Sequence, residues 1–374
     1  METLRVFEAF AGYGSQSMAL KRLGIDFEVV GISEIDKYAI QAYNSVHGET
    51  KNYGDISKIN WELVPDFDFF TYSFPCTDIS ASGQQKGLEE GSGTRSSLLW
   101  ECRKAIETKK PKYLLMENVK ALTSKKFMPY LKQWLSYLSR LGYSNYTKVL
   151  NAKDYGIPQN RERVFVVSIM GDNNFSFSEP FILERNLEYI LESNVEEHFY
   201  LNNERIRIDK PTREKMFVKY TRDKKGIVVE RRLSNISNTV HTSTGNGGNT
   251  GCFVYEPKIM QVFNIKEERN YKNPSTGRVY LPIGISPTLT TMQGGDREPK
   301  ILTCDYRIRK LTPRECFRLM GVSDTDIDKI QEAGISKTQQ YKMAGNSIVV
   351  DVLYHIFRKL FVDRNSENSQ LSLF

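Results

Sequence analysis

The stretch LRVFEAFAGYGSQSMALKRLG, residues 4–24, joins an apolar run to an amphipathic segment through a turn that contains two glycines. The apolar run predicts a buried strand over 4–10, and the amphipathic segment predicts a helix over 15–24. Glycines between a strand and a helix let the backbone approach a ligand at the carboxyl end of a parallel sheet, although a simple tight turn uses the same residues. The stretch therefore predicts the opening unit of an α/β domain and marks its first turn as a candidate ligand site.

The alternation of apolar runs and amphipathic segments continues to about residue 170. We expect further strands at 28–34, 67–74, 113–119 and 163–170. We expect the intervening helices at 37–48, 97–110 and 127–143. Strands separated by helices of this length predict a mostly parallel sheet that is covered on both faces.

The pattern changes at about residue 171, where the chain becomes richer in Asn, Gly, Thr and Arg with irregular spacing. The helical pattern returns after Arg309. A Thr followed by Pro predicts the start of a helix over 312–321, and a turn followed by a long helix is expected over 338–361.

These changes divide the chain into two expected domains. An α/β domain would consist of residues 1–178 and 304–374, because the C-terminal helix returns to it, and a smaller loop-rich domain would consist of residues 179–303. Two passages in the second domain, 237–248 and 286–295, each contain a β-prone Thr run followed by glycines. Turns between strands and a target-reading surface both explain such a pair.

The charge of the chain is compatible with a polyanionic partner. The 374 residues have a formal net charge of +7 and a sequence pI of about 8.9. Residues 201–232 hold eleven Lys and Arg against five Asp and Glu, which is nearly the whole excess. A solvated surface and a phosphate-facing stripe are both consistent with this run.

Cysteine usage and hydropathy point to a reducing compartment. The five cysteines are an odd number without Cys-x-x-Cys spacing, so we expect neither a disulfide framework nor a metal site. The sequence shows neither a signal-peptide pattern nor an apolar stretch long enough to span a membrane. We therefore expect a soluble, cytoplasmic protein.

Two acidic residues follow the next predicted strands. Glu34 ends the strand at 28–34, where a carboxylate can accept from both hydroxyls of a ribose, and Asp55 in GDIS could accept from an adenine amino group. Each carboxylate taken alone is equally well explained as an exposed loop residue. With the glycine turn, their order suggests an adenosine-containing cofactor and leaves NAD and S-adenosylmethionine both open.

Three further motifs bring reactive side chains to strand ends. SFPCTDIS carries Cys76 on a Pro-Cys loop, where a thiol is a nucleophile if a positive environment lowers its pKa. A lone cysteine is more often a buried structural residue, but the position on this loop favours the nucleophile. MENV brings Glu117 to the same edge, and QNRERV brings Arg161 and Arg163. A thiol, an acid and two guanidinium groups are therefore expected to converge.

The sequence resembles the DNA cytosine-5 methyltransferases of the bacterial or phage restriction-modification type. The motifs that carry the resemblance occur in the family's order and lie outside residues 171–303: FAGYG, the Glu34 and Asp55 positions, PCTDIS, ENV, QNRER, RKLTPRECFRLMG (309–321) and AGNSIVV (344–350). Thr77 stands where many members carry Gln, and Ile35 where an aromatic residue is frequent. The resemblance implies a Rossmann-like S-adenosylmethionine-dependent methyltransferase domain together with a target recognition domain.

The resemblance also implies a cofactor site for S-adenosylmethionine. Phe10 would stack on the adenine, and Asn346 would close the pocket. The glycines of the first turn would give the backbone access to the ligand. The expected cofactor-binding residues are Phe10, Gly12, Gly14, Glu34, Ile35, Asp55, Ile56 and Asn346.

For the reaction, the resemblance implies attack of the Cys76 thiolate on carbon-6 of cytosine, which makes carbon-5 reactive towards the methyl donor. Glu117 would bind N3 and the exocyclic amino group. Arg163 would orient the base and help hold the thiolate, with Arg161 as a supporting contact. The cytosine must be flipped out of duplex DNA to reach these groups.

The partner implied is double-stranded DNA. Residues 231–251 and 286–297 are candidates for reading its sequence, and the Gly-, Ser- and Gln-rich loop 81–97 is a candidate lid, although a plain surface loop explains it equally well. No obligate protein partner is evident, so we expect a monomer. A cognate restriction endonuclease would act separately.

Three alternative functions are considered. A tRNA cytosine-5 methyltransferase uses the same scaffold, but the large middle segment favours a duplex DNA site. A nicotinamide-dependent oxidoreductase shares the glycine turn and gives no reason for Cys76, Glu117 and Arg163 to lie at adjoining edges. The same three residues argue against a catalytically inactive DNA-binding module.

Overall fold

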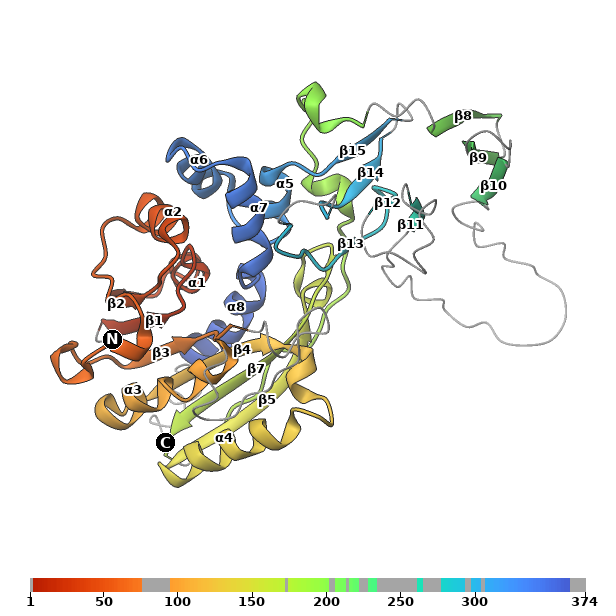
Figure 1. Ribbon diagram of the computed structural model, residues 1–374. Helices are drawn as coiled ribbons and strands as arrows, with labels where there is room; N and C mark the ends of the chain where they lie inside the picture. Colours follow the sequence, from red (N-terminus) through yellow and green to blue (C-terminus); the bar gives the residue numbers. More distant parts are fainter. Residues whose placement is uncertain are drawn as a thin grey trace, which may run out of the picture.

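A six-stranded sheet lies at the centre of the computed structural model, in the order β2-β1-β3-β4-β7-β5 (Figure 1). Its strands are β1 Leu4–Ala9, β2 Phe27–Ser33, β3 Phe69–Tyr72, β4 Tyr113–Val119, β5 Tyr143–Asn151 and β7 Glu162–Met170. The structure describes residues 3–75, 95–171, 174–201, 206–212, 215–221, 228–233, 261–264, 277–292, 297–303 and 307–363. Neighbouring strands from β2 to β4 are parallel, whereas β7 is antiparallel to both β4 and β5. The mostly parallel sheet is confirmed, because β7 is the one reversed strand in this six-stranded sheet.

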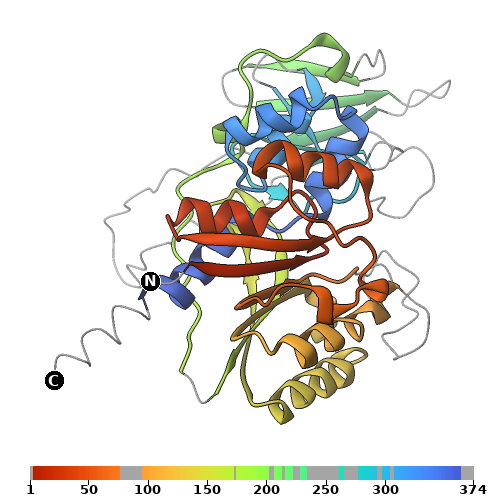
Figure 2. The same cartoon turned by 90° about the vertical axis from the view of Figure 1, so that its left-hand side faces the viewer.

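Helices cover both faces of the sheet (Figure 2). The α-helices are α1 Ser15–Arg22, α2 Lys37–His47, α3 Cys102–Lys109, α4 Met128–Arg140, α5 Pro313–Arg318, α6 Asp324–Glu332, α7 Lys337–Asn346 and α8 Val350–Phe357, which a π-helix over Arg358–Asp363 continues. The short 3-10 helices are η1 Ile56–Lys58, η2 Trp61–Leu63, η3 Arg95–Leu99, η4 Lys120–Thr123, η5 Ala152–Tyr155, η6 Leu187–Ile190 and η7 Glu197–Phe199.

Successive strand residues enter different buried clusters on the two faces. Val6 and Phe69 pack with residues of α1 and α8, whereas the next residues, Phe7 and Phe70, pack with residues of α3 and α4. A strand that is buried on both faces has no polar alternation, which explains why these strands appear in the sequence as continuous apolar runs.

β5 was not expected from the sequence. It is paired only on one side, with β7, at the end of the sheet. Most of its residues are partly exposed, and YSNYTKVLN accordingly lacks an apolar run. An edge strand of this composition carries no strong sequence signal.

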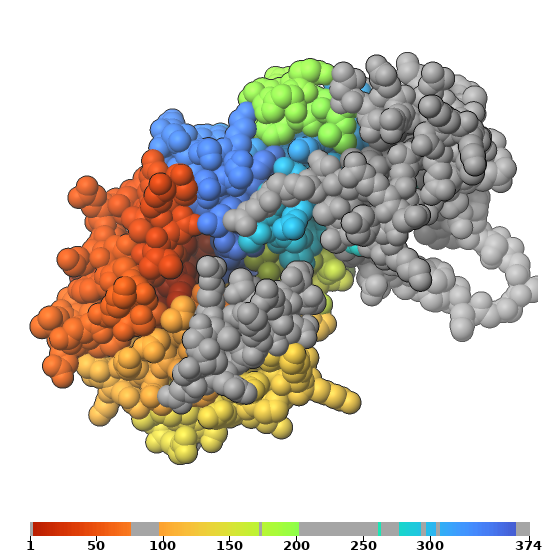
Figure 3. Space-filling model, viewed as in Figure 1, coloured from red at the N-terminus to blue at the C-terminus, as the bar shows by residue number. Residues whose placement is uncertain are grey.

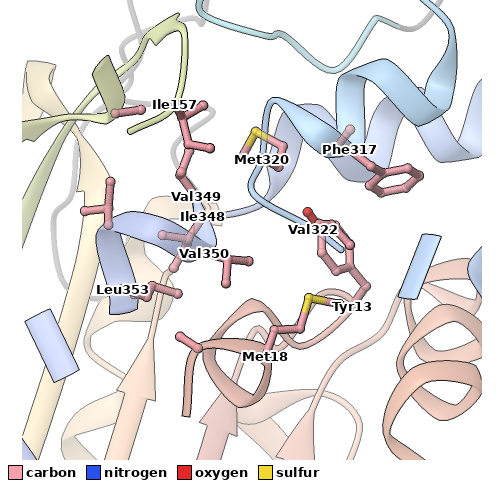
Figure 4. Packing of buried hydrophobic residues seen from close by; sticks show 14 of the residues in the cluster. Tyr13, Met18, Ile157, Phe317, Met320, Val322, Ile348, Val349, Val350 and Leu353 are labelled. Atoms are coloured by element: carbon pink, nitrogen blue, oxygen red, sulfur yellow. The ribbon is translucent and has the colours of Figure 1, made fainter. Parts of the chain in front are cut away.

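The C-terminal part of the chain returns to the sheet as expected, but its form differs. The predicted turn followed by one long helix over 338–361 is wrong, because α7 begins at Lys337 and ends at Asn346, and α8 begins only at Val350. The chain between the two helices is extended and brings Ile348 and Val349 into the core, where they lie between Ile157 and the α1 region (Figure 4).

The predicted start of the helix at 312 is confirmed. The Thr312 side chain accepts from the backbone of Glu315, and the Glu315 carboxylate accepts in return from the Thr312 N–H. Glu315 also accepts from both terminal nitrogens of Arg309 at 2.7 and 2.8 Å. This buried network fixes the point at which the chain re-enters the main core.

Smaller sheets lie beside the central one. They contain β8 Ile206–Thr212, β9 Lys215–Thr221 and β10 Val228–Leu233; β11 Gln261–Asn264, β12 Arg278–Tyr280, β14 Lys300–Leu302 and β15 Ile308–Lys310; and β6 Gln159–Asn160 with β13 Ser286–Pro287. The basic run at 201–232 coincides largely with β8–β10, which stand away from the central sheet in Figure 1.

The first part of the middle region packs against the main core. Leu187, Ile190 and Phe199 lie in the same buried cluster as residues of α5 and α8. None of the described helices is long and apolar enough to cross a membrane.

The central strand β1 buries an acidic side chain. Glu8 is fully buried, and its Oε1 accepts from Ser17 Oγ at 2.8 Å. Its Oε2 has no hydrogen-bond partner among the described residues. Burial raises the pKa of Glu8 from 4.5 to about 7, and the hydrogen bond from Ser17 opposes this rise only in part.

We predict that Glu8 makes folding pH-dependent. Its folded pKa lies above its unfolded pKa, so its stabilising contribution is complete below about 4.5 and is lost as the pH rises through about 7. The loss amounts to roughly 3 kcal/mol in the free energy of unfolding. Chemical denaturation at about pH 5 and about pH 8 measures it. Glu8→Gln, which stays neutral, should lose this part of the pH dependence, and an unchanged dependence would contradict the assignment.

Candidate active site

The turn after β1 is held over the end of β2. Phe10 N and Ala11 N donate to Ser33 O at 2.7 and 3.3 Å. Gly12 and Gly14 have φ of +59° and +83°, in the region that favours glycine. A Cβ on Gly14 would also lie 2.4 Å from His47 Nε2, so a larger residue does not fit there. The backbone of the predicted ligand turn therefore favours glycine at position 12 and leaves no room for a larger residue at position 14.

The Glu34 carboxylate is fixed at the mouth of this turn. Its Oε2 accepts from Gly12 N at 2.9 Å, and its Oε1 accepts from Ile35 N at 2.8 Å and Asp36 N at 2.9 Å. Asn52 holds the backbone of Glu34 from the other side through two hydrogen bonds. A carboxylate oxygen has about two acceptor sites, so Oε1 is already satisfied by its two N–H donors, whereas Oε2 keeps one site for a ligand hydroxyl.

The next loop brings a second carboxylate beside the first. Ser33 Oγ donates to Gly54 O at 2.7 Å and so ties this loop to the end of β2. Asp55 Oδ1 accepts from the backbone and the hydroxyl of Ser57, and these hydrogen bonds lower the pKa of Asp55. Ile56 is buried in the core beneath the loop. Asp55 is therefore an ionised, partly exposed acceptor at the same edge of the sheet as Glu34.

The remaining candidate cofactor residues differ in exposure. Phe10 is partly buried, Ile35 is 75% exposed, and Asn346 is exposed at the last residue of α7. A Cβ placed on Gly12 meets no atom within 4 Å, so space is open beside the turn. Dark red N-terminal residues are set back between the orange and blue segments of the surface (Figure 3). An open glycine turn flanked by two fixed carboxylates fits the ribose hydroxyls and amino group of an adenosine.

A buried acid and a guanidinium meet at the neighbouring strands. Glu117 lies near the end of β4 and is 8% exposed. Its Oε1 lies 3.3 Å from Arg163 Nε. Burial raises the pKa of Glu117, while the charges of Arg163 and Arg161 and a hydrogen bond with Ser73 oppose the rise. The protonated fraction of Glu117 near neutral pH is therefore larger than that of an exposed glutamate.

The loop that leads to Cys76 is attached to the same strand end. Asn118 Nδ2 donates to Phe74 O at 3.0 Å, and both residues are buried. Cys76 itself lies outside the described residues, as do Thr77 and nearly all of the candidate lid at 81–97. No local sequence pattern marks this role of Asn118, because its partner lies 44 positions away along the chain.

Arg161 occupies a different place from Arg163. Its guanidinium donates to the backbone oxygens of Leu289 at 3.0 Å, Gly345 at 3.1 Å and Ser347 at 2.7 Å. The residue is 3% exposed. The expected convergence thus holds for Glu117 and Arg163, whereas these hydrogen bonds of Arg161 go to backbone carbonyls from distant segments.

Comparisons with known proteins identify relatives over nearly the whole chain. The profile of the family described as C-5 cytosine-specific DNA methylase matches residues 4–362. The chain is 37% identical to the type II methyltransferase M2.ScrFI of Lactococcus lactis subsp. cremoris, over 96% of this chain and 99% of that protein. It is 33% identical to the type II methyltransferase M.HhaI of Haemophilus parahaemolyticus, over 94% and 93%.

The fold has solved counterparts as well. The crystal structure of the Dnmt2 methyltransferase from S. pombe superimposes with a TM-score of 0.66 at 18% identity, covering 97% of this chain and 99% of that one. At this identity the similarity concerns the fold. The family match over nearly the whole sequence shows more: the chain belongs to the C-5 cytosine-specific DNA methylases, which transfer a methyl group from S-adenosylmethionine to carbon-5 of cytosine in DNA.

Proposed function

We propose that the chain methylates cytosine within a specific sequence of duplex DNA, through a covalent bond between Cys76 and carbon-6 of a flipped-out base. The observation that carries this proposal is the contact of Glu117 with Arg163, at the strand end to which Asn118 attaches the Phe74–Pro75 loop. Cys76 follows Pro75 directly in the sequence. An acid, a guanidinium and a nucleophile are thereby available to one base.

Glu117 and Arg163 would prepare the base for attack. A protonated Glu117 can donate to N3 of cytosine, and its raised pKa keeps that proton available. Proton donation to N3 draws electron density from the ring, so the Cys76 thiolate can form its bond to carbon-6. Arg163 would orient the base and favour the thiolate form of Cys76 by its charge. Once carbon-5 has taken the methyl group that the bound donor would supply, loss of the carbon-5 proton to a base would expel Cys76, return the N3 proton to Glu117 and restore the aromatic ring.

The cofactor would be held by the residues around the first turn. S-adenosylmethionine, when bound, supplies an electrophilic methyl group. We assign the ribose hydroxyls to Glu34 and the adenine amino group to Asp55, with Phe10 and Ile56 against the ring. Exposed Ile35 and Asn346 would border the same site. Gly12 and Gly14 would provide the close backbone approach.

We propose residues 179–303 as the target recognition domain and residues 1–178 and 304–374 as the catalytic domain. The sheet β8–β10 and the strands β11, β12 and β14 lie outside the central sheet and support this division, while β15, in residues 304–374, pairs with β14 across the proposed boundary. The basic composition of 201–232 suits contact with phosphates. We further propose a monomeric, cytoplasmic enzyme. Relatives named type II methyltransferases favour action beside a separate restriction endonuclease, whereas phage relatives carry the name orphan methyltransferase.

We predict that the wild-type enzyme forms a stable adduct with duplex DNA that contains 5-fluorocytosine, because fluorine at carbon-5 prevents the final loss of a proton. Denaturing electrophoresis and mass spectrometry would detect it. Cys76→Ala should form none and should still bind DNA. Cys102→Ala, which removes a buried thiol of α3, is the matched control and should keep the adduct. Activity on tRNA without activity on duplex DNA would refute the proposed substrate.

We predict that Glu117→Gln lowers the single-turnover rate of methyl transfer by about 100-fold or more, since it removes the proton donor. In the wild type, the protonated form of Glu117 is depleted as the pH rises through its raised pKa, so this group lowers the rate at high pH. The variant should lack that decline. Glu162→Gln changes a half-exposed neighbour that pairs with Lys120 and should behave as wild type. An identical pH profile in Glu117→Gln would exclude the donor role.

We predict that Glu34→Ala weakens binding of S-adenosylmethionine by about tenfold or more, because hydrogen bonds to a charged group contribute roughly 1.5–3 kcal/mol. Calorimetric titration without DNA measures this directly. Glu62→Ala, at an exposed glutamate of η2, is the control. Equal affinity of Glu34→Ala and wild type would place the ribose elsewhere.

A further inference from the structure

One segment of the middle region is built into the catalytic core. We name residues 286–292, SPTLTTM, the crossing segment. It begins as β13, which pairs in parallel with β6. Thr288 Oγ1 donates to Asn160 O at 2.6 Å, and Leu289 N donates to Gln159 Oε1 at 3.2 Å. The crossing segment is therefore bound along the QNR motif rather than lying over it as a loose loop.

Its other side lies directly against the end of α7. A Cβ built on Gly345 would lie 1.9 Å from Thr290 O and 2.8 Å from Thr291 N. Real Cβ atoms do not approach backbone atoms so closely. The backbones of α7 and the crossing segment are thus in direct contact, and Gly345 permits it because it has no side chain.

Arg161 joins the same two backbones through its side chain. Its Nη1 donates to Leu289 O in the crossing segment, and its Nη2 donates to Gly345 O in the last turn of α7 and to Ser347 O just beyond that helix. The charge is almost completely removed from water, so these hydrogen bonds offset a large desolvation cost. A planar guanidinium holds its acceptors in a fixed arrangement, so a displacement on one side of Arg161 affects the other side.

The residues beyond α7 also contact the proposed cofactor turn. The Tyr13 hydroxyl and Ser347 Oγ form a short hydrogen bond. Tyr13 lies between Gly12, which donates to Glu34, and Gly14. Asn346, a proposed cofactor residue, lies in the sequence between Gly345 and Ser347, whose carbonyls both accept from Arg161. An unbroken set of contacts therefore runs from the cofactor turn to the crossing segment.

We infer that Arg161 is a positioning residue that couples cofactor binding to DNA binding. A cofactor in the first turn would order Tyr13 and residues 345–347, and Arg161 would transmit this order to the crossing segment. That segment leads directly into residues 293–297, which belong to the stretch proposed to read DNA. The inference rests on the proposed function, because it takes the first turn as the cofactor site and the middle region as the DNA site.

Such coupling is a measurable free energy and must act in both directions. The test uses a fluorescent duplex fragment that the wild-type enzyme methylates, with and without S-adenosylhomocysteine, which occupies the cofactor site without turnover. We expect S-adenosylhomocysteine to tighten DNA binding by the wild type about fivefold or more. In Arg161→Met this ratio should fall below about twofold, because the methionine cannot bind the three carbonyls.

Two further variants examine the route of the coupling. Arg161→Lys should give an intermediate ratio, since an ammonium group donates hydrogen bonds without the planar arrangement. Tyr13→Phe removes the hydroxyl that meets Ser347 and should lower the ratio while Arg161 stays in place. Arg22→Met is the matched control: Arg22 donates to Gly321 O and pairs with Asp351, away from the crossing segment, so the ratio should stay as in the wild type.

The outcomes separate the two proposals. A wild type that traps the 5-fluorocytosine adduct but shows no effect of S-adenosylhomocysteine on DNA binding overturns the coupling and leaves the proposed function intact. The coupling is also overturned if folded Arg161→Met keeps the wild-type ratio. Thermal unfolding verifies that each variant is folded. If Arg161→Met does not fold, Tyr13→Phe decides in the same way, and a wild-type ratio in that variant refutes the inference.

Discussion

β7 runs against the direction of the other five strands in the central sheet. Parallel strands bring their carboxyl ends to one edge, and a reversed strand brings its beginning to that edge instead. Arg163 near the start of β7 therefore meets Glu117 near the end of β4, with Val119 directly paired to Arg163. If β7 were parallel, the guanidinium of Arg163 would lie at the opposite edge, and Glu117 would lose its ion pair with Arg163. The proposed chemistry depends on this one strand direction.

The second constraint is that the C-terminal chain must return to cover the sheet. Val350 and Leu353 fill the same buried cluster as Val6 and Phe69. The end of α7 must at the same time leave room for the backbone of Thr290. These two demands explain the break between α7 and α8, since one straight helix could not meet both. The break also brings the backbone carbonyls of Gly345 and Ser347 within reach of Arg161.

Much of the fold was predictable from local patterns. Apolar runs gave β1, β2, β3, β4 and β7 because these strands are buried on both faces, and Thr312 with Pro313 marked a helix start through its cap. β5 escaped prediction because it lies at an edge and is mostly half-exposed. The direction of β7 and the break at Ser347 depend on tertiary packing, which no local pattern encodes.

The site was predictable only as a set of residue types at strand ends. Glu117 and Arg163 come together as their motifs predicted. The partners of Arg161 lie 128, 184 and 186 positions away in the sequence. The short spacing between Arg161 and Arg163 therefore could not reveal that Arg161 binds backbone carbonyls whereas Arg163 contacts Glu117. The hydrogen bond from Asn118 to Phe74 is hidden for the same reason. Every residue has a backbone carbonyl, so a hydrogen bond to one leaves no mark on the identity of the partner residue in the sequence.

The tight contact between Gly345 and Thr290 has a consequence for exchanging specificity between relatives. A chimera that imports a foreign recognition region must join it to the host somewhere near residue 286. A junction placed before Ser286 keeps the crossing segment with the host α7 and QNR residues that are shaped to receive it. A junction placed after Met292 brings a foreign crossing segment against a helix that leaves no room for a different backbone path. The segment that can be exchanged between relatives is therefore shorter than the proposed target recognition domain, residues 179–303.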